Sequence, residues 1–184
     1  MVQIGGLTLV SFKLSLIFIV ILAIFVSGCV TPTTNFSSEG ISFQYPAYWN
    51  QASIPTNDQV LANQSGFKIL GVILESDNLT NYIFYVGVGK SNNNLEVASL
   101  KLYQNFILKN TNSTINTQTM LRNGYPAYVY SYNTQRTSSN RTLVEKTYVF
   151  TKDNLTSYYL MFAAPEGYFE EKKMENLVDS VVII

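Results

Sequence analysis

The chain has 184 residues, and its 12 basic and 12 acidic residues balance to a formal charge of zero. Because a balanced charge provides no basic field, we expect no nucleic-acid partner. Histidine is absent, which removes the usual general base, the histidine-containing catalytic triads and the commonest metal ligand. The composition therefore predicts a protein that is not an enzyme and carries no cofactor.

The first thirty residues are typical of an export signal of the lipoprotein type. Lys13 is followed by the apolar run of residues 14–26, and small residues then precede Cys29, the single cysteine of the chain. We expect cleavage after residue 28 and a lipid on Cys29. The alternative is an uncleaved transmembrane anchor, because residues 14–30 are just long enough to span a bilayer. Either anchor leaves the rest of the chain on the outer face of the cytoplasmic membrane, since Lys13 favours the cytoplasmic side.

The remainder divides into a polar tether, residues 29–39, and a single domain, residues 40–184. With Cys29 used at the anchor, this domain has no disulfide and must be held by packing. The exported chain also contains six Asn-x-Ser/Thr triplets, each a candidate glycosylation site, which would make the protein a glycoprotein. Their asparagines are Asn35, Asn63, Asn78, Asn112, Asn140 and Asn154.

The first half of the domain has strand patterns. Residues 40–45 alternate apolar and polar side chains, and Trp49 follows in a turn that we expect to pack beneath a sheet. Residues 67–74 and 82–88 form two further strands of one hairpin, with residues 75–78 as the turn between them.

The second half combines two helices with more strands. Asn94 and its neighbours begin an amphipathic helix over residues 94–109. Closely spaced strands then predict an antiparallel meander, with turn chemistry at Asn123-Gly124 and Asp153-Asn154. Helical spacing returns over residues 168–182. The meander strands are residues 114–121, 127–132, 142–151 and 157–163. This order predicts an α+β domain with a central antiparallel sheet flanked by the two helices.

Three segments of the chain resemble the PsbP-like domains. Residues 40–49 resemble the opening strand and its "YPxxW" segment, residues 124–127 the "GxPA" turn, and residues 158–166 with 179–181 the closing strand and helix. The resemblance implies an α/β/α sandwich, and the chain is most similar to the archaeal lipoproteins related to this family. The ion-retaining role of the plant photosystem member is not carried over, because nothing else in the chain indicates photosynthesis.

Two groups of residues are candidate binding sites. Glu75, Asp77 and Asn78 could supply oxygen ligands to Ca²⁺, although the spacing of an EF-hand is absent and an ordinary solvated turn is the favoured explanation. Tyr128, Tyr130 and Tyr132 lie on one face of a strand, and Tyr148 with Phe150 could extend them into an aromatic surface for a sugar or a partner protein. The alternative is that helices cover these rings.

These observations favour a membrane-anchored, extracytoplasmic accessory domain that docks onto a membrane or envelope complex. A surface lipoprotein that binds a small ligand, a carbohydrate or a metal ion such as Ca²⁺ is the alternative.

Overall fold

A computed structural model describes residues 31–54, 56–64, 66–78, 81–111, 113–136 and 141–184, and residues 33–184 form one compact unit. The export segment and Cys29 lie outside the described residues, as do Asn112 and Asn140. Within the described part, no helix is long and apolar enough to cross a membrane.

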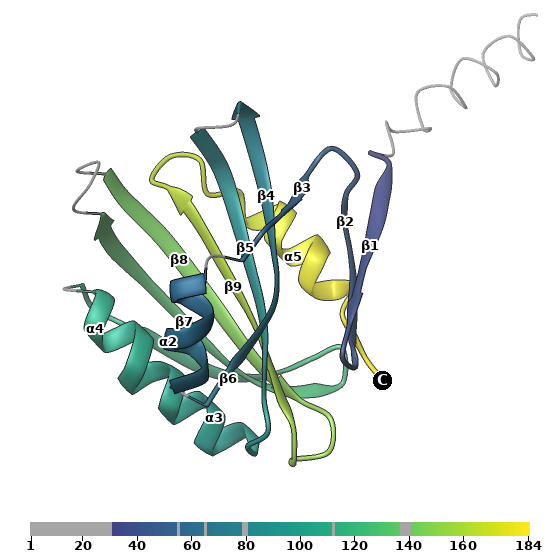
Figure 1. Cartoon of the computed structure of the whole chain (residues 1–184), viewed down its shortest axis with the longest axis vertical. Helices are drawn as coiled ribbons and strands as arrows, with labels where there is room; N and C mark the ends of the chain where they lie inside the picture. Colours follow the sequence, from purple (N-terminus) through teal and green to yellow (C-terminus); the bar gives the residue numbers. More distant parts are fainter. Residues whose placement is uncertain (1–30, 55, 65, 79–80, 112, 137–140) are drawn as a thin grey trace, which may run out of the picture. The chain divides into compact units, whose positions relative to one another are not determined.

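Seven antiparallel strands form the central sheet, in the order β3-β4-β5-β9-β8-β7-β6 (Figure 1). The predicted hairpin, β4 with β5, and the predicted meander, β6 to β9, are both confirmed. β9 lies in the middle of the sheet and is buried on both faces, whereas β6 is an exposed outer strand. The strands are β3 (Asn50–Ala52), β4 (Lys68–Asn78), β5 (Asn81–Ser91), β6 (Asn116–Arg122), β7 (Tyr125–Arg136), β8 (Arg141–Thr151) and β9 (Ser157–Pro165).

A second, three-stranded sheet contains β1 (Thr33–Ser38), β2 (Ile41–Pro46) and β10 (Val182–Ile183). Its first strand corrects the sequence prediction, which assigned these residues to the tether. β1 is rich in Thr and Ser and mostly exposed, so its sequence looks like a linker, but Phe36 is buried and stacks on Phe43 of β2 at 4.9 Å. The folded domain therefore begins at Thr33 rather than at residue 40.

The first predicted helix is confirmed as a continuous helical segment. It consists of α3 (Leu95–Leu102), a π-helical turn η1 (Tyr103–Ile107) and α4 (Leu108–Asn110). Asn94 caps it, because its side-chain oxygen accepts a hydrogen bond from the Val97 backbone N–H at 2.9 Å.

One predicted helix is shorter in the structure, and one helix was not predicted. α5 (Glu171–Asp179) is shorter than the predicted 168–182, because Ser180 ends it and the chain then turns into β10. The apolar spacing continues past the helix because Val181 and Ile183 stay buried in the core as extended chain. Helix α2 (Thr56–Gln64) had no strong amphipathic pattern and was not predicted.

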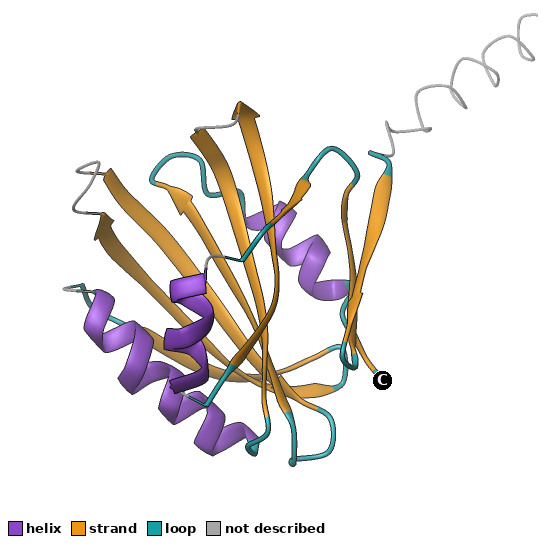
Figure 2. Cartoon of the chain, viewed as in Figure 1, coloured by secondary structure: helices purple, strands orange, loops and turns teal. Residues whose placement is uncertain are grey.

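Each face of the central sheet has its own core (Figure 2). α2 and the α3–η1–α4 segment cover one face around Phe67, Leu102 and Tyr159. α5 and the small sheet together cover the other face, where Trp49 packs against Phe84 at 5.4 Å. The domain is mostly antiparallel strand with few helices, which is compatible with the predicted α+β class. The predicted helix-flanked sheet is corrected, because β1, β2 and β10 share the second face with α5.

Candidate functional site

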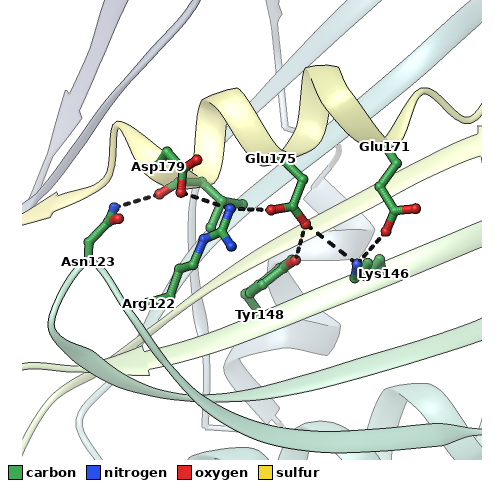
Figure 3. A network of polar contacts seen from close by, with 8 residues as sticks. Arg122, Asn123, Lys146, Tyr148, Glu171, Glu175 and Asp179 are labelled. Atoms are coloured by element: carbon green, nitrogen blue, oxygen red, sulfur yellow. Dashed lines mark hydrogen bonds and ion pairs between the residues drawn. The ribbon is translucent and has the colours of Figure 1, made fainter.

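The densest group of charged side chains in the described part lies between α5 and the sheet (Figure 3). Glu171, Glu175 and Asp179 recur every four residues and therefore lie on one side of α5. The central sheet presents Arg122 from β6 and Lys146 from β8 to these carboxylates. Sequence reasoning missed this group because its cations and carboxylates lie 25 to 57 positions apart in the numbering of the chain.

Two bridges organise this polar network. Arg122 contacts Glu175 and lies 2.7 Å from Asp179 Oδ1. Lys146 Nζ lies 2.8 Å from Glu171 Oε1 and 3.7 Å from Glu175 Oε1. The Tyr148 hydroxyl donates a hydrogen bond to Glu175 at 3.2 Å. Glu175 is thus the shared acceptor that joins both cations to the helix.

The pKa values in this region suit permanent ion pairs. Partial burial works to lower the pKa of Lys146, but the hydrogen bond to Glu171 and the nearby charges raise it above its usual range. Burial and Glu175 raise the pKa of Tyr148. A lysine that acts as a general base needs the opposite shift, toward neutral pH. The network therefore holds α5 on the sheet, and the pKa of Lys146 is shifted away from the range that a general base needs.

Glu75, one of the predicted calcium ligands, belongs to a second ion-pair group. It lies within β4 and not in a turn, which corrects the predicted turn over residues 75–78. Both of its oxygens accept hydrogen bonds from Lys173 Nζ, at 3.0 and 2.9 Å, and Tyr48 donates to it at 3.3 Å. The side chains of Asp77 and Asn78 lie outside the described residues. Among the side chains that are described, no group of three Asp, Glu, Cys or His could hold a metal ion.

The predicted aromatic surface is covered. Tyr130 and Tyr132 are each only 5% exposed, and Tyr128 is partly buried beside them. Tyr130 lies 5.7 Å from the ring of Tyr103 in η1, and its hydroxyl bonds to Ser99 of α3. The strand supports packing, as the alternative interpretation expected.

The expected extension of this surface by Tyr148 and Phe150 is wrong. Tyr128 pairs with Val149 and Tyr130 pairs with Thr147, so these four side chains share one face. Tyr148 and Phe150 point to the opposite face, where they stack at 5.7 Å. The register between β7 and β8 decides which of their side chains share a face, and the sequence of either strand alone does not reveal this register.

Three of the six glycosylation candidates can be placed. Asn35 on β1, Asn63 on α2 and Asn154 in the β8–β9 turn are exposed. The side chain of Asn78 lies outside the described residues, together with Asn112 and Asn140. Exposure at Asn35, Asn63 and Asn154 is compatible with the predicted use of these triplets.

The outer edge of β6 is a further surface feature. β6 has β7 as its one strand neighbour, and its register is continuous from Asn116 to Arg122. The two-residue turn Asn123-Gly124 has left-handed φ values of 52° and 79°, which makes the flanking residues a hydrogen-bonded pair. By alternation, Thr117, Thr119 and Leu121 direct their backbone groups away from β7. Within the described residues, no strand occupies that side.

Two hollows complete the set of candidate sites. One, of about 400 Å³, lies beside the polar network and is lined by Ser113, Asn133, Lys146, Phe169 and Glu171 among others. The other, of about 500 Å³, contains Glu39, Lys68 and Lys90. Neither hollow was predicted from the sequence, because both are assembled from segments that are distant in the chain.

Comparisons with known proteins extend only to the fold. No family model matches this sequence. The search of curated proteins also finds no match. The fold is similar to that of LpqN of Mycobacterium tuberculosis, which is described as involved in cell envelope biogenesis. That match has a TM-score of 0.51 and 12% identity, and it covers 83% of this chain and 90% of LpqN.

A protein of Bacteroides thetaiotaomicron is also similar, with a TM-score of 0.50 and 13% identity over 82% of this chain. The chain spans about half of that protein's length, 48%. At these identities the likeness concerns the arrangement of the backbone, and it carries no residue roles from one protein to another.

Proposed function

We propose that this chain is a membrane-anchored, extracytoplasmic accessory domain of the PsbP-like type, which binds a component of a membrane or envelope complex and catalyses no reaction. The observation that carries the proposal is that the charged residues of the domain bind one another and so stabilise the fold. Arg122, Lys146 and Lys173 each form ion pairs that fix α5 to the sheet. The richest polar chemistry of the described domain therefore stabilises the fold.

Two further observations support this proposal. Residues 1–29 carry the lipoprotein-type export pattern, which would keep the domain at the membrane. The similar fold of LpqN belongs to a protein involved in cell envelope biogenesis. A PsbP-like domain would also account for the resemblance at the β2–Trp49 segment, the β6–β7 turn and β9.

The outer edge of β6 is the surface that we assign to this binding. An exposed edge strand accepts an extended segment of another protein through backbone hydrogen bonds. β6 contains no Pro, no Lys and no bulge, which are the usual devices that block such pairing. Leu121 is 73% exposed beside this edge and offers an apolar contact.

The test is crosslinking of the full-length protein in its native membrane, followed by purification and mass spectrometry. Thr119→Pro is the informative variant, because Pro removes an outward N–H from the edge but no bond to β7. Thr119→Val is the matched control, since it keeps that N–H. We expect one dominant complex with the natural chain and with Thr119→Val, and its loss with Thr119→Pro.

An unchanged complex with Thr119→Pro would exclude the β6 edge as the binding surface. The absence of any recurrent partner would count against an accessory domain altogether. The mass of the peptide containing Cys29, measured in the same preparation, distinguishes a lipid anchor from an uncleaved transmembrane segment.

A further inference from the structure

The hollow of about 500 Å³ lies where the turn between β1 and β2 meets the ends of β4 and β5. Its polar lining consists of Glu39 from that turn, Lys68 and Lys90 from the sheet, and the amides Asn63, Asn92 and Asn93. Asn93 is held in place on two sides. Its side-chain NH₂ donates to Ser91 Oγ at 2.7 Å, and its backbone carbonyl accepts from Ser157 Oγ at 2.9 Å.

The two lysines face one another directly. Lys68 of β4 and Lys90 of β5 are register partners, an arrangement in which like charges destabilise the strand pair. Glu39 relieves this repulsion in part, because its carboxylate pairs with Lys68 and lies 3.8 Å from Lys90 Nζ. Lys68 accordingly holds the pKa of Glu39 below its usual range.

A third amine contacts a residue of the lining but does not itself line the hollow. Lys101 of α3 donates to Asn93 Oδ1 at 3.4 Å, and its Nζ also lies 3.4 Å from the position of a Cβ on Gly66. Around the hollow, one carboxylate is therefore set against three amines, two of which, Lys68 and Lys90, line it. This local excess of two positive charges stands in a chain whose total charge is zero.

Glu39 occupies its place in an unfavourable backbone conformation. Its φ is 43°, and it fills the first position of a two-residue turn that Asn, Asp or Gly normally occupies. Contacts with the sheet maintain this conformation, since its carbonyl accepts hydrogen bonds from the Tyr158 hydroxyl at 2.9 Å and from Lys90 at 3.4 Å. The turn thus presents a carboxylate to the two lysines at some cost in backbone energy.

We propose that this hollow is a binding site for a phosphate group, carried either by free phosphate or by a phosphate monoester, and that the Glu39 carboxylate is its internal competitor. A phosphate dianion offers two negative charges to Lys68 and Lys90, whereas the Glu39 carboxylate offers only one. Lysine binds phosphate as a point charge, and asparagine amides add neutral donors. This inference is independent of the β6 edge, which involves other strands.

The test measures phosphate binding to the full-length protein in nonionic detergent, by calorimetry and by the shift in unfolding temperature. Inorganic phosphate and glycerol 3-phosphate are the probes, and sodium chloride at matched ionic strength is the reference. We expect stabilisation by at least one phosphate probe beyond the effect of chloride. Stabilisation by glycerol 3-phosphate alone would assign the site to monoesters, and stabilisation by inorganic phosphate would show that the free ion suffices.

Variants separate this site from a purely structural Glu39. Glu39→Gln removes the competitor, so we expect phosphate to bind about two- to fivefold tighter, the range that an exposed ion pair contributes. A structural role alone predicts lower stability and no gain in phosphate affinity. Lys68→Met with Lys90→Met should abolish binding while it relieves the repulsion between the strands, so this double variant should stay folded. Lys172→Met, on the exposed side of α5, is the control for overall charge.

Three results would overturn the proposal. The first is that neither phosphate probe binds to the natural chain or to Glu39→Gln. The second is that phosphate affinity is unchanged in the double lysine variant. The third is that Lys172→Met loses as much phosphate affinity as the double lysine variant. If Glu39→Gln does not fold, Lys101→Met provides the second measurement. It should weaken phosphate binding without any change in the β1–β2 turn.

Discussion

The ring of Tyr159 on β9 lies over Gly89 on β5, its direct register partner. A Cβ placed on Gly89 would overlap this ring. Gly87 and Gly89 thus lie within a strand and leave room for side chains of the helix-covered core. The two glycines of the sequence Gly-Val-Gly-Lys-Ser at residues 87–91 are thus explained by ring packing inside the sheet.

We expect Gly89→Ala to lower the free energy of unfolding by about 1–3 kcal/mol, because overpacking displaces a buried ring. Urea denaturation followed by the fluorescence of Trp49 measures this change. Gly87→Ala is the matched control, since its nearest neighbour is the partly exposed side chain of Tyr85 at 3.1 Å. An equal loss in both variants would contradict the assigned contact.

The polar network under α5 predicts unequal coupling between its members. We expect Arg122→Met to cost about 1–3 kcal/mol, because it leaves a partly buried carboxylate with fewer partners. In double-mutant cycles, the coupling of Arg122 with Glu175 should be about 1 kcal/mol or more, and the coupling with Asp179 a few tenths. The reason is exposure, since the side chain of Asp179 is 58% exposed and that of Glu175 is 31% exposed. Equal coupling energies would show that both pairs contribute alike.

The sequence predicted the strands and the α3 segment because their signals are local. Alternating side chains mark β4 to β9, and Asn94 with the apolar spacing marks the start of the helix. β1 and β10 were missed because each is defined by its partner, β2. β1 consists mostly of Thr and Ser, and the two apolar residues of β10 continue the helical spacing of α5. Local patterns therefore sufficed for β4 to β9 of the central sheet and for β2, but not for the short strand β3 or for the partners of β2 in the small sheet.

The candidate sites were harder to predict for the same reason. Lys68 and Lys90 are unremarkable in the sequence and become opposed only through the register of β4 and β5. The tyrosines of β7 carried a clear period-two pattern, but the pattern did not reveal which face α3 covers. Sites made by pairing between distant segments need the fold before they can be recognised.

Stability should fall at alkaline pH because the folded state opposes the loss of several protons. Burial raises the pKa values of Tyr132 and Tyr159. Burial opposes a rise at Lys173, but its hydrogen bonds to Glu170 and Glu75 raise its pKa overall. A pKa that folding raises gives stability that is complete below the unfolded-state value, about 10 for both residue types, and is lost as the pH rises through the folded-state value.

We therefore expect the urea midpoint to be constant from pH 7 to about pH 9 and to fall steeply above about pH 10. The tyrosinate absorbance of the buried residues Tyr132 and Tyr159 should appear together with unfolding. Tyr159→Phe should make the fall of the urea midpoint at alkaline pH less steep, because it removes one buried hydroxyl that ionises after unfolding. Tyr168→Phe, an exposed tyrosine, is the control and should leave the slope unchanged.

The turn between β6 and β7 should stabilise the end of α5 through one side chain. Asn123 has a φ of 52°, and its NH₂ donates to the carbonyls of Val178 at 2.8 Å and Val181 at 3.3 Å. Asn123→Gly keeps the left-handed backbone but loses both hydrogen bonds, and we expect a cost of about 1 kcal/mol. Asn123→Ala loses the bonds and adds backbone strain, so its cost should be greater by about 1 kcal/mol. Chemical denaturation of both variants checks this order, and equal losses would mean that the conformation of Asn123 contributes nothing beyond its hydrogen bonds.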